Sequence, residues 1–295
     1  MLAGHIDEID FLITHIDDNG YLYIRPVGGW DPQIVQGQRV RILGKRGRVL
    51  GAIGKIPIHL QKPESRSKVV GIDDVWVDIG VDSRKAAEKR VSIGDPLVLD
   101  YEYERLHDDL AVARGFDDRI GAYIVLEAAR LAKKLKAVAD VHSVATVQEE
   151  IGLRGATTAA GGIQPDIGIA VDVTFATDHP GMGSAMQGEG RVNVGGGPVL
   201  TRGPNINHKL FDLMVSTAKK QKIPVQITAE PRGTGTDANA LQLTGDGVAT
   251  ALVGVPNRYM HSPCEIVSLT DVDHCVALIG HTIAAITPRT NFIPF

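Results

Sequence analysis

Several features that define protein classes are scarce in this sequence. It has two cysteines, Cys264 and Cys275, which cannot form the disulfide framework of a small secreted protein. No apolar run approaches the ~18 residues that a membrane span needs. The first twenty residues contain four Asp and one Glu, a composition that a secretory signal does not tolerate. These absences predict a cytoplasmic protein with no membrane partner.

Positive charge is not in excess either. The chain has 31 Lys and Arg against 35 Asp and Glu, and the net charge of −4 excludes a generally basic nucleic-acid binder. Aromatic residues make up only 5%. Glycine is abundant, because 33 glycines in 295 residues exceed the usual ~7%, which indicates many tight turns and loops brought close to a ligand. At 43% hydrophobic residues, the chain can bury a core in one large domain or two modest ones.

The pattern of hydrophobic residues changes along the chain. Up to about residue 105, short apolar stretches such as FLITHI and YLYIRPV alternate with turn signals such as DDNG, which predicts an antiparallel barrel or sandwich. The only helix candidate in this part is the short polar segment 83–90.

After about Gly115, helical and strand patterns alternate. Apolar residues at 120, 124, 128, 131 and 135 predict one face of an amphipathic helix over 120–136. A last helix is expected to open at Thr270, with Asp273 completing a weak capping box. A further helix is expected at 207–221, and strands at 141–147, 166–173, 223–229 and 248–255. This alternation predicts an α/β sheet covered by helices on both faces.

Acidic and imidazole groups gather at the ends of the expected strands. Such residues are more often caps or solvated loop residues, and adjacent acidic pairs are usually solvated. Asp172 is harder to dismiss, because a carboxylate inside an apolar strand is costly to bury without a partner or a metal. Strand ends converge on one crevice in an open α/β sheet, and imidazole with carboxylates suits Zn²⁺ or Co²⁺. The candidates are His5 and Asp7, two apart in an expected strand and so on one face, Asp117–Asp118, Glu149–Glu150, Asp172 and His261.

A family resemblance runs through the whole chain. The strings MLAGHIDEI, GGWDPQ, WVDIGVDSRKAAEK, FDDRIG, VQEEIGLRGA, GTDANA and VPNRYMHSP resemble the glutamyl-aminopeptidase and "cellulase M" family of dinuclear metallo-aminopeptidases, several known as tetrahedral aminopeptidases. The resemblance implies an α/β fold in which a mixed-sheet metallopeptidase catalytic domain, 1–5 and 106–295, carries an inserted β-barrel oligomerisation domain, 6–105. The family resemblance begins at His5, and family members have a further segment before this point. The N-terminal part of the catalytic domain is therefore expected to be missing.

The resemblance also implies a role for each candidate. The site would hold two divalent ions, and each ion would have three protein ligands. The ions would be zinc or cobalt, and manganese is a third option. The implied roles are His5 and Asp172 on the first ion, Glu150 and His261 on the second, Asp117 bridging both, Asp7 holding the His5 imidazole, and Glu149 as the general base. Three ligands per ion leave positions for a shared water and for the free amine of a peptide. The loop GTGTD at 233–237 would lie near this site, although a plain turn explains it equally well.

The implied function is a metal-dependent aminopeptidase that removes N-terminal residues from short peptides. Its subunits would form homodimers, and six dimers would close into a tetrahedral dodecamer. Three alternatives stay open: a related dimetal amide hydrolase, such as a carboxypeptidase or deacylase; a non-catalytic assembly paralogue; and a glucanase. The glucanase is disfavoured, because sugar cleavage needs two flanking carboxylates and stacking aromatic residues.

Overall fold

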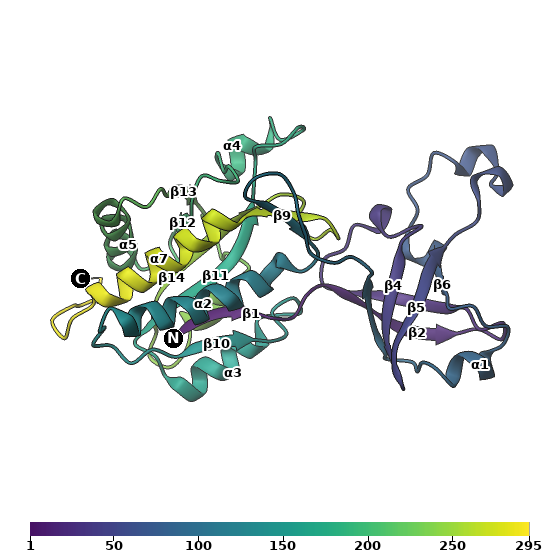
Figure 1. The fold of residues 1–295 in the computed structure, drawn as a ribbon, viewed down its shortest axis with the longest axis horizontal. Helices are drawn as coiled ribbons and strands as arrows, with labels where there is room; N and C mark the ends of the chain where they lie inside the picture. The colour runs from purple at the N-terminus through teal and green to yellow at the C-terminus, as the bar shows by residue number, and fades with distance from the viewer. Residues whose placement is uncertain (295) are drawn as a thin grey trace. The chain divides into compact units, whose positions relative to one another are not determined.

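The structure is a computed structural model, which describes residues 1–294 and divides into two compact units. The sheet unit comprises residues 1–8, 103–260 and the chain from residue 264 onward. The barrel unit comprises residues 9–102 and 261–263. The fold class predicted from the sequence is confirmed: one unit is a mixed α/β structure and the other is a closed antiparallel barrel (Figure 1). Among the described residues, no helix is long and apolar enough to cross a membrane.

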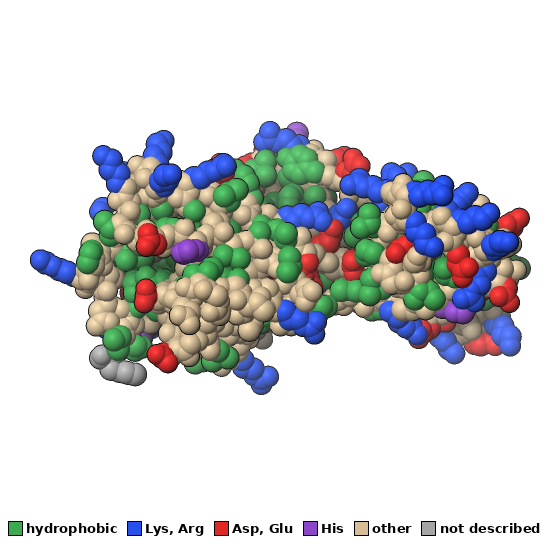
Figure 2. Space-filling view, turned by 90° about the horizontal axis from the view of Figure 1, so that it is seen from below, with side chains coloured by type: hydrophobic (Ala, Val, Ile, Leu, Met, Phe, Trp, Pro, Cys, Tyr) green, Lys and Arg blue, Asp and Glu red, His purple; other side chains and the backbone are tan. Residues whose placement is uncertain are grey.

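The barrel unit closes in the strand order β2-β3-β6-β5-β4-β7. Alternate residues of each strand point inward, and Phe11 in the interior stacks on Trp30 of the GGWDPQ turn at a ring separation of 4.8 Å. Figure 2 shows Lys and Arg mixed with Asp and Glu over the visible surface of this unit. Its elements are β2 Asp10–Ile16, β3 Leu22–Val27, β4 Arg39–Gly44, β5 Gly47–Gly54, β6 Trp76–Asp78, β7 Pro96–Leu99, α1 Arg84–Glu88, and the 3₁₀ turns Pro32–Ile34, Ile58–Leu60, Pro63–Ser65 and Ile72–Asp74.

The sheet unit is built on a six-stranded sheet in the order β10-β1-β11-β14-β12-β13. The first four of these strands are mutually parallel, so their carboxyl ends meet at one edge, whereas β12 runs antiparallel to β14. A second, three-stranded sheet has the order β15-β9-β8. The strands are β1 Leu2–His5, β8 Glu104–Arg105, β9 Leu110–Ala113, β10 Ser143–Thr146, β11 Ile167–Phe175, β12 Val199–Arg202, β13 Gln226–Ala229, β14 Ala249–Asn257 and β15 Glu265–Ser268.

Two groups of helices pack on the six-stranded sheet. Helix α7 contacts both α2 and α5, and all three contact the sheet, whereas α3 and α6 form the other group. In Figure 1, α2 and α7 lie side by side and α3 lies apart from them. The bounds are α2 Phe116–Lys134, α3 Arg154–Ile163, α4 Ala185–Glu189, α5 His208–Gln221, α6 Asp237–Leu241 and α7 Leu269–Ala285. The core between these layers is apolar, as the periodicity of the sequence predicts.

The start of α7 differs from the prediction. The sequence pattern placed it at Thr270 with a capping box to Asp273, but the helix begins at Leu269 and its N-cap is Ser268. The Ser268 hydroxyl accepts a hydrogen bond from the Asp271 backbone N–H at 3.1 Å. Ser268 ends β15 and is fully buried, so its hydroxyl is already fixed beside the first turn of the helix and takes the capping role.

A pair of glycines brings β1 and α2 into close contact. A Cβ added to Gly4 would lie 2.4 Å from the backbone carbonyl carbon of Gly121, closer than any real Cβ contact. Glycine at position 4 therefore lets the strand lie directly on the helix backbone. This approach places His5, at the end of β1, beside Asp117 and Asp118 at the start of α2.

Candidate metal centre

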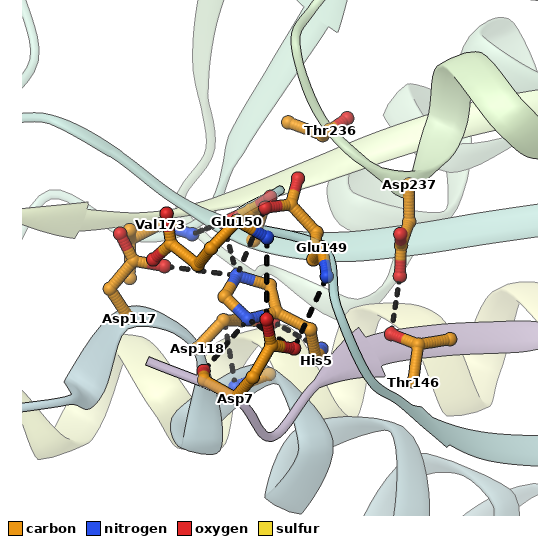
Figure 3. Close-up of polar contacts among 12 residues, drawn as sticks. His5, Asp7, Asp117, Asp118, Thr146, Glu149, Glu150, Val173, Thr236 and Asp237 are labelled. Carbon is orange, nitrogen blue, oxygen red and sulfur yellow. Dashed lines mark hydrogen bonds and ion pairs between the residues drawn. The ribbon is translucent and has the colours of Figure 1, made fainter. Parts of the chain in front are cut away.

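His5 is the centre of a buried polar cluster at the carboxyl edge of the sheet. It is the last residue of β1, and only 2% of it is exposed. Its Nε2 lies 3.1 Å from Oδ1 of Asp117 and 3.9 Å from Oδ1 of Asp172. One ligand atom from each of these three residues lies within 4.8 Å of the others. The structure thus brings three of the predicted metal ligands close together, and Figure 3 shows two of them, His5 and Asp117, side by side.

Asp117 and Asp118 are both buried, so the general expectation that adjacent acidic residues form a solvated face is wrong for this pair. They lie in the first turn of α2, where their backbone angles are not helical and the peptide bond between them is cis. The Asp117 backbone N–H donates to Glu265 at 3.0 Å. Asp118 accepts from the backbone N–H of His5 at 3.1 Å and of Gly121 at 3.0 Å. Asp118 therefore fastens β1 to α2 beside the cluster.

Glu149 and Glu150 follow β10, the strand that pairs with β1. Glu149 is buried, and its Oε2 lies 3.8 Å from the His5 Nε2. Glu150 is half-buried, and one of its carboxylate oxygens lies within 4.8 Å of an oxygen of Asp117. The predicted base, Glu149, thus lies beside His5, and a predicted ligand of the second ion, Glu150, lies beside Asp117.

Asp7 lies just beyond β1. The expectation that His5 and Asp7 share a strand face is wrong, because the strand ends at His5. The two carboxylate oxygens of Asp7 accept the backbone N–H groups of Glu149 and Glu150, each at 3.3 Å. The His5 Nδ1 lies 3.0 Å from the backbone carbonyl of Asp7 and 3.6 Å from its carboxylate.

His261 is in the segment 261–263, which groups with the barrel unit. Its backbone is in the left-handed region, with φ of 61°, and its Nδ1 lies 2.8 Å from the carbonyl oxygen of Gly29. Met260 and Cys264, on either side of the segment, belong to the sheet unit.

Two buried acidic residues of the site, Glu265 and Asp237, were not among the candidates from the sequence, and Asp118 was a candidate without an assigned role. Asp237 is the first residue of α6, and its Oδ2 accepts from the Thr146 hydroxyl at 2.5 Å. Thr146 is the register partner of His5. The available signal for Asp237 was the glycine-rich loop that precedes it, and Glu265 had none, because its contact with Asp117 joins residues 148 positions apart.

The electrostatics of the cluster favour a bound cation. Burial and the neighbouring carboxylates raise the pKa values of Asp118 and Asp172 well above their usual range. Burial and the charge of Asp237 raise the pKa of Glu149 to about 8. For His5, burial lowers the pKa, but the hydrogen bond to Asp117 and the nearby carboxylate of Asp7 outweigh it and raise the pKa overall. A buried group of acids around one imidazole fits a divalent metal ion.

Known structures with the same architecture define the class of the protein. A TET aminopeptidase from a marine-sediment Thaumarchaeota archaeon superposes with a TM-score of 0.89 and 34% identity, over 97% of this chain and 81% of that one. A second similar structure is the TET1 peptidase of Pyrococcus horikoshii, which can assemble into a tetrahedron or a large octahedral shell. It superposes with a TM-score of 0.81 and 31% identity, over 97% of this chain and 83% of that one. Fold and site together define a peptide hydrolase of the aminopeptidase class.

The sequence comparison narrows this class to a family. The chain belongs to the M42 glutamyl aminopeptidase family, whose pattern matches residues 1–278. It is similar to the lysyl aminopeptidase of Pyrococcus furiosus, with 39% identity over 296 residues, which span 100% of this chain and 83% of that relative. The resemblance noted in the sequence motifs is therefore confirmed.

Proposed function

We propose that this protein is a dinuclear metal-dependent aminopeptidase that removes N-terminal residues from short peptides. The observation that carries the proposal is that His5, Asp117 and Asp172 are buried close to one another, with Glu149 beside His5 and Glu150 beside Asp117. The membership of the M42 family supports the peptidase activity.

In this proposal Asp117 is shared by two ions. His5 and Asp172 complete the first ligand set, and Glu150 and His261 complete the second. The proximity of Asp117 to both His5 and Glu150 supports a bridging role. The part of His261 in the second set rests on the family resemblance of its motif, VPNRYMHSP. Zinc or cobalt suits these donors, and manganese also accepts them. Two such ions supply a water of lowered pKa and a stabilised oxyanion.

Glu149 is the proposed general base. It is buried beside His5 and is not needed in either ligand set, so its carboxylate is available to take a proton from the attacking water. It then passes that proton to the amine of the departing peptide. Asp7 supports the site from beside it, through its contacts with the Glu149 and Glu150 backbone.

The two units have different proposed roles. The sheet unit carries the chemistry, and the barrel unit makes subunit contacts. The assembly of the Pyrococcus horikoshii TET1 peptidase into a tetrahedron or an octahedral shell supports a tetrahedral dodecamer of this chain, which we propose is built from homodimers. A cytoplasmic location is part of the same proposal. A closed shell would restrict the substrates to short, unfolded peptides.

Hydrolysis of a panel of aminoacyl-p-nitroanilides tests the function. We expect turnover of free-amine substrates that chelator abolishes and that zinc or cobalt restores, and no turnover of the same substrates after N-acetylation. Hydrolysis of acetyl-amino acids or of C-terminal residues instead would identify the deacylase or carboxypeptidase alternative. A metal-loaded protein that hydrolyses none of them would be the assembly paralogue.

A further inference from the structure

The turn that carries Glu149 and Glu150 is held on one side by its own chain. The residue before it, Gln148, has a left-handed backbone with φ of 60°. The backbone N–H groups of Gly152 and Leu153 donate to the carbonyl oxygen of Glu149, at 2.9 and 3.1 Å. These bonds satisfy the carbonyl of this turn and leave its N–H groups to find partners elsewhere.

The partner of both N–H groups is the Asp7 side chain. One carboxylate oxygen accepts from Glu149 and the other from Glu150, and Figure 3 shows the Asp7 carboxylate beside the backbone of both residues. A buried backbone N–H without a partner costs free energy comparable to a lost hydrogen bond. The carboxylate of Asp7 therefore fixes where the turn lies relative to the end of β1, and so fixes both acidic side chains relative to His5.

The same residue holds the His5 imidazole through a different group. The nearest acceptor to Nδ1 is the backbone carbonyl of Asp7 at 3.0 Å, and the carboxylate is farther away at 3.6 Å. A proton on Nδ1 that is donated to this carbonyl leaves Nε2, 3.1 Å from Asp117, to act as the ligand atom. A substitution at position 7 changes the side chain and leaves this carbonyl in place.

We propose that Asp7 is a positioning residue for the Glu149–Glu150 turn, which it holds with both carboxylate oxygens, while its backbone carbonyl fixes the His5 tautomer. This inference deepens the proposed function and rests on it. It differs from a role in which the Asp7 carboxylate orients the imidazole. The two roles affect different ions, because His5 belongs to the first ligand set and Glu150 to the second.

The variant Asp7→Asn separates these roles. Asparagine has one acceptor oxygen and one NH₂ donor, so it satisfies one of the two N–H groups and opposes the other. We expect faster amide hydrogen exchange in the peptide 147–152 of the metal-free protein, measured by mass spectrometry. Calorimetry with Zn²⁺ should show the second ion bound ~10–100-fold more weakly and the first ion within about threefold of the unsubstituted protein. The kcat should fall by a similar ~10–100-fold.

Two further variants provide the controls. Asp7→Glu keeps both oxygens on a longer arm and should restore part of the exchange protection and of the second-ion affinity that Asn loses. Asp17→Asn is a matched control in the barrel unit, where Asp17 accepts the backbone N–H groups of Asn19 and Tyr21 at 3.0 and 2.9 Å. It should leave the exchange of 147–152 and both metal affinities unchanged.

The outcomes are distinct. Weaker binding of the first ion with unaltered exchange in 147–152 would overturn the inference. It would show that the Asp7 carboxylate orients the His5 imidazole. Unaltered exchange and unaltered affinities would also overturn it. If the unsubstituted protein binds no metal and cleaves no peptide, the proposed function fails, and this inference fails with it. If the unsubstituted protein binds metal and cleaves peptides, but Asp7→Asn leaves the exchange of 147–152 unaltered, only the inference about Asp7 fails.

Discussion

The carboxylates around His5 hold more negative charge than one imidazole can balance in a buried site. The three residues with the most strongly perturbed carboxyl groups, Asp118, Glu149 and Asp172, are all shielded from water and close to one another. Each carries a raised pKa because its ionised form lacks both water and sufficient positive charge. A divalent ion supplies that charge, and its binding is therefore coupled to the loss of protons from these groups.

The proposed role of Glu149 as the general base can be tested with one substitution, Glu149→Gln. In Glu149→Gln the side chain keeps its shape but cannot accept a proton, so we expect kcat to fall by ~10²–10⁴-fold. Because Glu149 lies outside both proposed ligand sets, the metal content of the variant should equal that of the unsubstituted protein. Steady-state kinetics and elemental analysis of the same sample measure the two quantities. Near-full activity with full metal content would remove Glu149 from this role.

The pH dependence of the metal-free protein tests the charge balance. Folding raises the pKa of Glu149 from 4.5 to about 8, so the folded state binds more protons than the unfolded state between these values. The free energy of unfolding then falls as pH rises through this range. His5 acts in the same direction above pH 6.5, because its pKa is also raised. We expect the Tm in chelator to decrease from pH 5 to pH 8, and added zinc to stabilise the protein most at the upper end.

A Tm in chelator that rises or stays constant over the same range would contradict this charge balance. Buffers of constant ionic strength are the appropriate control, since salt screens exposed pairs such as Arg84–Glu88 and would change their contribution.

At the level of residues, the motifs pointed to the acids that gather around His5, and this part needed no structure. The residues that support the cluster were harder to predict. Asp118 belongs to a pair that is usually solvated, and only the close contact of β1 with α2 explains its burial. Glu265 and Asp237 act through partners far away in the sequence, Asp117 and Thr146, and a single sequence does not reveal such pairs.

At the level of secondary structure, the contact between β1 and α2 sets the distance between His5 and Asp117, two members of the proposed first ligand set. Gly4 allows it, because any side chain at this position would meet the backbone of Gly121. His5 follows Gly4 directly and Asp117 lies in the first turn of α2, so a wider gap would separate the imidazole from the carboxylate.

Gly4→Ala should therefore lower both stability and metal affinity. Forcing an extra carbon into a packed contact costs about 1–3 kcal/mol, and the shift of β1 should weaken binding of the first ion. The matched control is Gly161→Ala in α3, where an added Cβ meets nothing within 4 Å and alanine favours the helix by about 0.5–1 kcal/mol. Urea unfolding and calorimetry measure the two effects. A Gly4→Ala protein with unchanged metal affinity would show that this contact does not position the site.

The elements themselves followed the sequence closely where hydrophobic period and length agreed. The predicted helix at 207–221 is found at His208–Gln221, and the predicted strand at 248–255 is found at Ala249–Asn257. The sequence predicted the first and last residues of these elements less accurately. The strand expected at 223–229 begins only at Gln226, and α7 takes its cap from Ser268, because tertiary contacts decide which of several polar residues caps a helix.

At the level of the whole molecule, assembly can be tested in solution. The barrel unit is the proposed subunit contact, and closed symmetry requires a self-complementary surface on each copy. Multi-angle light scattering on the full chain at micromolar concentration should give the mass of a dimer or of a dodecamer. A monomer would contradict the proposed role of the barrel unit, whereas a dimer alone would contradict only the tetrahedral shell.

The central claim is that two divalent ions share Asp117. Anomalous diffraction from crystals grown with zinc or cobalt locates such ions directly. The account predicts two peaks per chain, separated by ~3.5–4 Å, with Asp117 between them, His5 and Asp172 on one side and Glu150 on the other. A fully metal-loaded crystal with a single peak or none at these residues, or with Asp117 bound to neither ion, would contradict it.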